Sequence, residues 1–162
     1  MTMQYDVESY HNTVSGVAVP YRTRLKGVVI SPVSSTTYNV AIANNVSQSG
    51  TYNIPGTTTC TVTIAGHGVA SGSRVWLQFA DGDGVSNMYV VTAVTIDTFT
   101  VTTGVLTTSG NVTVYNDILA EFDCATGTSF YTLIPGEGIM ALDGIYVGLP
   151  AADAVSSTIF YG

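Results

Sequence analysis

The stretch "NMYVVTAVTIDTFTVTTG" (87–104) carries the pattern that decides the fold class. Its two halves, 87–95 and 98–104, are rich in Val and Thr and alternate, or nearly so, between apolar and polar residues. A period of two places successive side chains on opposite faces of a strand, and β-branched and aromatic residues favour that conformation. The stretch therefore predicts two strands joined by a tight corner at "TID" (95–97).

The same pattern extends along most of the chain. "TCTVTIAG" (59–66), "RVWLQFA" (74–80) and "NVTVYN" (111–116) read as further strands, and "DGDG" (81–84) and "TSGN" (108–111) read as turns between strands. A short turn of helix around "AADAV" (151–155) is the single helical candidate. The predicted fold class is all-β.

The middle of the chain differs from its flanks. Between about residues 47 and 115 the strands are Thr-rich and the turns short, as in a small β-barrel or sandwich, whereas both flanks carry longer aliphatic strands. The first flank supplies only about two strands, too few to close a core alone. We therefore predict an extended N-terminal arm (1–20), an outer β-sandwich built from both flanks (21–46 plus 116–162), and an inserted small β-barrel module (47–115).

Two Ile-Pro-Gly joints, at 54–56 and 134–136, punctuate this pattern. Proline cannot donate to a ladder and glycine permits a sharp corner. Both joints are predicted to be strand exits at sheet edges.

The low charge of the chain limits the classes of partner that it can bind. Only 9% of the 162 residues are charged and the net charge is −7, which argues against a nucleic-acid partner. The longest apolar runs have four or five residues, far short of a membrane helix, and the polar N-terminus predicts no export signal. A surface of Thr, Ser, Asn, Gly and Tyr favours assembly with other protein surfaces.

Three of the four cations alternate in "YRTRLKGVV" (21–29): Arg22, Arg24 and Lys26. On a strand they would share one face. They are interface candidates that could contact an acidic partner subunit, and a solvated strand face is the alternative.

A search for catalytic and metal-binding motifs predicts no catalytic residue, no cofactor and no metal site. Asp81 and Asp83 fit a hairpin turn better than a calcium loop, which would need further oxygen ligands. Asp117, Glu121 and Asp123 would share a strand face. A charged solvent face, or a contact for a neighbour's cations, is favoured there over an acid pair for glycoside cleavage.

Four other side chains could carry a function. His67 between two glycines reads as a turn residue with a hydrogen-bonding role rather than a ligand. Cys60 and Cys124 read as buried reduced thiols, with a disulfide as the alternative. Trp76 lies on the strand face opposite Val75 and Leu77, and we favour a half-buried interface aromatic over a fully exposed sugar-stacking one.

Residues 57–104 resemble a β-module common in structural proteins of tailed bacteriophages, especially marine phages and cyanophages. The residues that carry this resemblance are Gly66, His67, Gly68, Gly72, Val75, Leu77, Tyr89, Val91, Val94, Phe99, Thr100 and Val101. A second element of such proteins is similar to "IPGEGI" (134–139), "GIYV" (144–147) and "FYG" (160–162).

The resemblance implies a virion context and supplies no catalytic residues. We expect a non-enzymatic capsid decoration protein, present in many copies on the outside of the head and assembled in the host cytoplasm. Its partners would be the major capsid protein, other virion proteins and its own copies, with a trimer favoured. A tail or head–tail connector protein, and a carbohydrate-binding module of an adhesin that recognises a surface glycan, are the alternatives.

Overall fold

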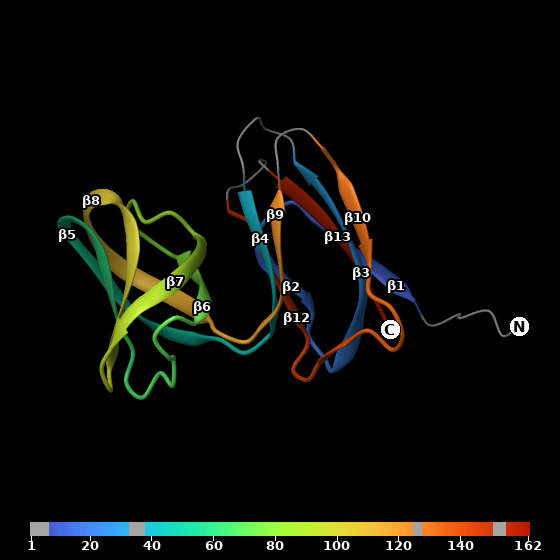
Figure 1. Cartoon of the computed structure of the whole chain (residues 1–162), viewed down its shortest axis with the longest axis horizontal. Coiled ribbons are helices and arrows are strands. Elements are labelled where there is room, and N and C mark those ends of the chain that lie inside the picture. The colour runs from blue at the N-terminus through green and yellow to red at the C-terminus, as the bar shows by residue number, and fades with distance from the viewer. Residues whose placement is uncertain (1–6, 33–37, 125–127, 151–154) are drawn as a thin grey trace, which may run out of the picture. The chain divides into compact units, whose positions relative to one another are not determined.

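The structure is a computed structural model that describes residues 7–32, 38–124, 128–150 and 155–162. All regular structure in these residues is β, in thirteen strands that form three antiparallel sheets (Figure 1). The all-β prediction is confirmed. Most of the predicted helical turn at 151–155 lies outside the described residues.

The chain divides into two compact units, residues 1–45 with 119–162 and residues 46–118. The sequence placed the inserted segment at 47–115.

The first unit is a sandwich of two sheets. One has the order β1 (Glu8–Asn12), β13 (Val155–Tyr161), β3 (Thr23–Pro32) and β10 (Phe130–Leu133), and β11 (Ile139–Ala141) also pairs with β3. The other has the order β2 (Gly16–Val19), β12 (Ile145–Gly148), β4 (Tyr38–Asn44) and β9 (Ile118–Cys124).

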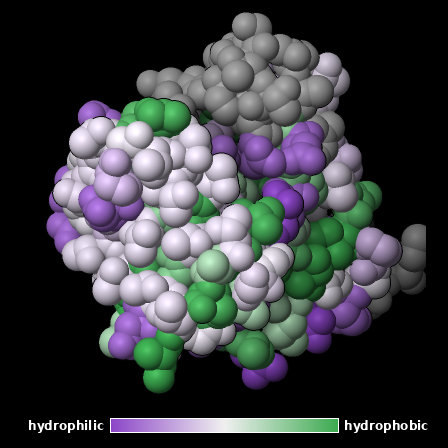
Figure 2. Space-filling model, turned by 60° about the vertical axis from the view of Figure 1, so that its left-hand side comes forward, coloured by the Kyte–Doolittle hydropathy of each residue, from purple (hydrophilic) through white to green (hydrophobic). Residues whose placement is uncertain are grey.

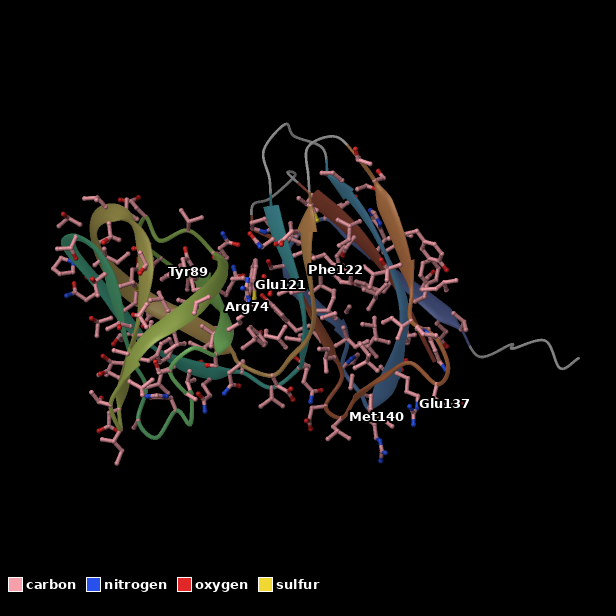
Figure 3. The ribbon with its side chains drawn as sticks, in the orientation of Figure 1. Arg74, Tyr89, Glu121, Phe122, Glu137 and Met140 are labelled. Atoms are coloured by element: carbon pink, nitrogen blue, oxygen red, sulfur yellow. The ribbon has the colours of Figure 1, made fainter. Side chains whose placement is uncertain are left out.

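Alternating residues of both sheets form the sandwich core. Leu25, Val28 and Ile30 of β3 and Ile159 of β13 face Ile42 of β4 and its neighbours, and each of these side chains is fully buried. Side chains fill the space between the strands (Figure 3). The regular burial pattern of β13 follows the two-residue period of its sequence, "VSSTIFY".

The predicted arm over residues 1–20 is corrected from residue 7 onward. β1 pairs with β13 in continuous antiparallel register, from Glu8 opposite Tyr161 to Asn12 opposite Ser157. β2 pairs with β12, and its Ala18 and Val19 are buried in the core. The strands were missed because each is only four or five residues long.

The second unit is one folded-over sheet with the order β5 (Gln48–Thr63), β8 (Thr98–Tyr115), β6 (Arg74–Phe79) and β7 (Asn87–Val94). β8 pairs with β5 along most of its length, with β6 at one end and with β7 at the other. The unit is therefore sandwich-like, and its described residues close no barrel. The barrel form of the prediction is not seen.

Two predicted turns differ in the structure. The "TSGN" segment (108–111) lies inside β8 and stays paired with β5, with Gly110 opposite Tyr52. The joint at Pro55 is a bulge within β5 rather than a strand exit, and Gly56 there has a φ of 75°. The second joint does leave a strand: Gly136, with a φ of 69°, lies between β10 and β11.

Candidate interaction surface and cavity

The basic residues of β3 share one face, as predicted. Thr23 and Leu25 are buried, Arg24 and Lys26 between and after them are half-buried, and Arg22 just before the strand is exposed. Within the described residues, no side-chain hydrogen bond or ion pair engages these three cations.

The same sheet presents apolar side chains further along this face. In register across the strands lie His11, Thr158, Val29 and Tyr131, and beside them Ser9, Phe160, Gly27 and Leu133. Leu133 is 65% exposed and Tyr131 is 54% exposed. The rings of Tyr131 and Phe160 meet edge to face with centroids 6.1 Å apart. We call Val29, Tyr131, Leu133 and Phe160 the apolar patch.

Sequence reasoning did not single out this patch. Its signal was present in "FYTL" (130–133), where large apolar residues occupy both phases of the alternation. A strand with one buried face and apolar residues on the other is the pattern to look for.

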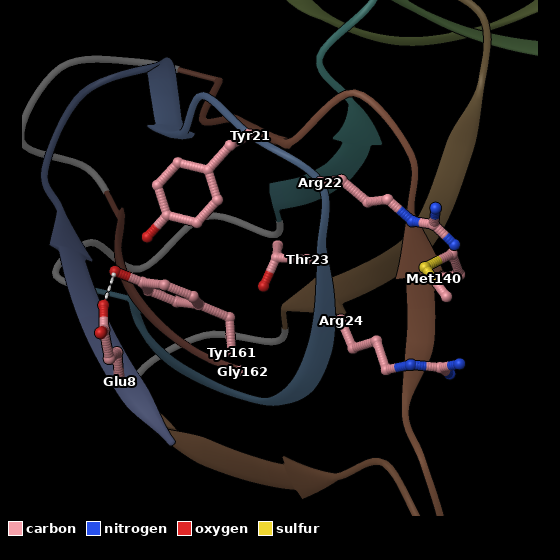
Figure 4. A pocket seen from close by; sticks show the side chains of 8 residues that line it. All are labelled: Glu8, Tyr21, Arg22, Thr23, Arg24, Met140, Tyr161 and Gly162. Atoms are coloured by element: carbon pink, nitrogen blue, oxygen red, sulfur yellow. Dashed lines mark hydrogen bonds between the residues drawn. The ribbon is translucent and has the colours of Figure 1, made fainter. Parts of the chain in front are cut away.

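A cavity of about 450 Å³ lies at the start of β3 (Figure 4). Its lining consists of Glu8, Tyr21, Arg22, Thr23, Arg24, Met140, Tyr161 and Gly162. The Tyr161 hydroxyl donates a 2.9 Å hydrogen bond to Oε2 of Glu8. That bond, followed by burial, the charge of Glu8 and the neighbouring Tyr21, raises the pKa of Tyr161 to about 12.

Trp76 is the predicted interface residue that the structure corrects. It has no exposed surface, and its indole N–H donates to Gln78 Oε1 at 3.3 Å. Its cross-strand neighbours Met88 and Tyr115 are also buried. It was misassigned because alternation places Trp76 on the face opposite Val75 and Leu77 and cannot reveal that the structure covers this face at Trp76.

The acidic residues of β9 are hydrogen-bonded from β4. The side-chain amide of Asn39 donates to Oδ1 of Asp123 and, at 3.4 Å, to Oε1 of Glu121. Asp117 is exposed and precedes the strand. The structure thus brings Glu121 and Asp123 to one amide group.

His67 has the hydrogen-bonding role in a turn that its sequence predicted. Its Nδ1 accepts a 3.0 Å hydrogen bond from the Val69 N–H, and its Nε2 lies 3.1 Å from the Thr95 carbonyl oxygen. These two partners require a neutral ring that is protonated at Nε2. The ring is buried and packs edge to face on Phe99.

Both thiols are free and buried, as predicted. Burial raises the pKa of Cys60 to about 11, and burial together with the charge of Asp123 does the same for Cys124.

Asp81 lies in the loop between β6 and β7 and ties it to neighbouring strands by hydrogen bonds. Its carboxylate accepts hydrogen bonds from the backbone and side-chain N–H groups of Asn111, at 2.5 and 2.9 Å. Its carbonyl oxygen accepts from the Tyr52 hydroxyl at 2.8 Å. The predicted turn is confirmed.

Over the described ranges, no group of three His, Cys, Asp or Glu side chains is placed to hold a metal ion. No helix in the described part of the chain is long and apolar enough to cross a membrane.

On the face shown in Figure 2, most residues have intermediate hydropathy, with separate apolar and strongly polar groups among them.

No family model and no curated protein matches this chain. Among solved structures it is similar to "Phage phi92 endosialidase", with 21% identity over 83% of this chain and 22% of that chain, and a TM-score of 0.34. It is also similar to "VP16-VP17 complex, a complex of the two major capsid proteins of bacteriophage P23-77", with 11% identity over 96% of each chain and a TM-score of 0.21. At these values neither similarity establishes a function for this chain.

Proposed function

We propose that this chain is a non-enzymatic structural protein of a tailed-phage virion that decorates the outside of the capsid shell. The motifs in 57–104 and 134–162 support a virion protein. The face of the sandwich that carries the apolar patch and the β3 cations supports a docking role. The protein would be made in the host cytoplasm and bind the major capsid protein as a homo-oligomer, with a trimer as the expected form.

The exposed apolar patch is the observation that carries this proposal. Leu133 and Tyr131 expose more than half of their surface next to Val29 and Phe160. Moving apolar surface out of water stabilises a contact by about 25 cal/mol per Å². A modest patch therefore gives a weak single contact, and linked copies on a lattice make it strong.

The β3 cations define the chemistry of the partner surface. Arg22, Arg24 and Lys26 carry three of the four Lys and Arg charges of a chain with net charge −7. An acidic patch on the shell would attract them over about 10 Å at 0.1 M salt. Binding to the shell is then expected to weaken as salt rises.

A binding experiment with capsid shells lacking this protein tests the proposal. Wild-type protein should bind to saturation at a stoichiometry set by the shell's symmetry. The double variant Tyr131→Ser/Leu133→Ser should bind at least about tenfold more weakly, because two central apolar anchors are lost.

The matched control is Ile96→Ser/Val105→Ser, which removes two exposed apolar side chains from the other unit, 81% and 69% exposed. It should leave shell binding unchanged. Equal losses in both variants, or no binding by wild type, would overturn the proposal. Binding to purified tails but not to shells would instead support the tail or connector role.

A further inference from the structure

The chain contains three Asp-Gly steps, at 81–82, 83–84 and 143–144. Such a step can rearrange, because the glycine nitrogen can attack the carboxyl carbon of the preceding side chain, and glycine has no Cβ to hinder the approach. The attack needs a carboxyl group without hydrogen-bond partners and a peptide unit that can rotate toward it. The three steps, all among the described residues, differ in both respects.

The step that begins at Asp81 is held at both groups. The two oxygens of the Asp81 carboxylate accept hydrogen bonds from the backbone and side-chain N–H groups of Asn111. The carbonyl oxygen of Asp81, which belongs to the peptide unit that would have to rotate, accepts from the Tyr52 hydroxyl at 2.8 Å. Carboxylate and peptide unit would both have to leave their partners before a ring could close.

The step that begins at Asp143 is held by its flanking backbone. The Asp143 N–H donates to Oδ1 of Asn44 at 3.0 Å. On the other side, the Gly144 carbonyl oxygen accepts from the Asn45 N–H at 3.0 Å, and Gly144 is buried. The peptide units before and after the step are therefore fixed, although the Asp143 side chain itself is exposed.

The step that begins at Asp83 lacks these hydrogen bonds. Asp83 is exposed, and within the described residues neither its carboxylate nor the Gly84 N–H has a hydrogen-bond partner. The Asp83 N–H donates to the Thr108 hydroxyl at 3.1 Å, which fixes only the preceding peptide unit. The Phe79 ring packs on the partly exposed Gly84, where a Cβ would lie 2.6 Å from that ring, so the packing requires glycine after Asp83.

We propose that Asp83 is a site of spontaneous conversion to isoaspartate. The Gly84 nitrogen forms a bond to Cγ of Asp83, and the carboxyl hydroxyl leaves as water together with the proton of that nitrogen. The product is a five-membered succinimide ring. Water then opens the ring: addition at Cγ restores aspartate, whereas addition at the backbone carbonyl carbon passes the main chain through Cγ. Water is the only co-reactant, and the net mass does not change.

The conversion would change the loop between β6 and β7. It inserts one carbon atom into the main chain and leaves the carboxylate on a shorter branch. This loop belongs to the second unit, whereas the apolar patch belongs to the first. The modification therefore does not depend on capsid decoration.

Ageing of the full chain in H₂¹⁸O tests this assignment. After several weeks at 37 °C and pH 6, electron-transfer dissociation of the digested peptides distinguishes isoaspartate from aspartate at each step. Incorporated ¹⁸O counts every ring opening, including those that restore aspartate. Both signals should be at least about tenfold higher at Asp83 than at Asp81 or Asp143, because hydrogen bonds must break first at the other two steps.

Two variants and one solvent separate the causes. Asp83→Glu should abolish both signals at this position, because its longer side chain cannot form the five-membered ring. The double variant Tyr52→Phe/Asn111→Ala removes side-chain donors from the first step and should raise the signals at Asp81. In concentrated urea, where the folded restraints are absent, the three steps should react at similar rates.

Equal signals at the three steps of the native chain, no signal at Asp83, or a preference for Asp83 that persists in urea would overturn the proposal. These results leave the capsid-shell experiment unaffected, because that experiment uses freshly prepared protein and reads the apolar patch. The two proposals can therefore fail separately.

Discussion

At the scale of single residues, His67 shows how a glycine-flanked side chain closes a turn. Its ring accepts from the Val69 N–H and donates to the Thr95 carbonyl oxygen, so it joins the β5–β6 loop to the end of β7. Both partners are backbone groups, and the ring itself packs edge to face on Phe99. The residue acts as a structural clamp.

Replacing His67 by Ala should destabilise the chain by about 2 kcal/mol, because a buried N–H loses its acceptor. For a unit of this size that corresponds to a fall in Tm of roughly 10 °C by differential scanning calorimetry. His11→Ala is the control, since His11 is exposed and its Nδ1 forms a hydrogen bond with the Thr158 hydroxyl at the surface. Equal shifts in the two variants would contradict the clamp.

The two cysteines give a second test at this scale. Both are fully buried, and both have a pKa of about 11. Iodoacetamide at pH 8 should leave both unmodified in the folded protein and alkylate both in guanidinium chloride, as read by mass spectrometry. Rapid labelling of the native chain, or an intramolecular disulfide, would show that this burial is wrong.

At the scale of elements, a truncation tests whether the N-terminal residues form an extended arm or edge strands of the sandwich. Removing residues 1–19 would delete β1 and β2. The buried side chains of Ala18 and Val19 would be lost, and the core residues of the sandwich that pack against them would be exposed. The truncated chain should lose β signal in circular dichroism and melt at a lower temperature. An unchanged spectrum and melting curve would instead support the predicted extended arm.

Sequence patterns predicted the strands that alternate over six or more residues, such as β6 and β7. These patterns failed where the local turn propensity of the residues disagrees with the strand pairing in the structure. Ser109 and Gly110 have turn propensity, yet β5 pairs with them and keeps β8 continuous. Trp76 was misplaced because the period of a strand gives its two faces without saying what covers each one.

The candidate site was predictable only in part. Alternation placed Arg22, Arg24 and Lys26 on one face. It could not show that Glu8 and Tyr161, which are far apart in the chain, become cross-strand partners that line the cavity at the start of β3. Long-range register, rather than any local motif, builds the cavity.

At the scale of the whole molecule, four weakly acidic side chains with raised pKa values link stability to alkaline pH. The pKa values of Cys60 and Cys124 rise from 9.0 to about 11. Those of Tyr89 and Tyr161 rise from 10.0 to about 12. Burial is the largest cause except for Tyr161, where the hydrogen bond to Glu8 comes first.

Because each folded-state value is raised, the unfolded chain releases these protons first. Their contribution to stability should be complete below about pH 9 and be lost as pH rises to about 12. Urea unfolding at pH 7, 9 and 11 should show midpoints that are level at first and then fall. A midpoint that stays constant to pH 11 would contradict the raised pKa values of these groups.

The central claim is that the face with the apolar patch docks on a capsid shell. Cryo-electron microscopy of whole phage particles tests it most directly. We predict density for this chain at regular positions on the outside of the head, with Tyr131 and Leu133 turned toward the shell. Heads without this density, or density in which the patch faces solvent, would contradict the claim.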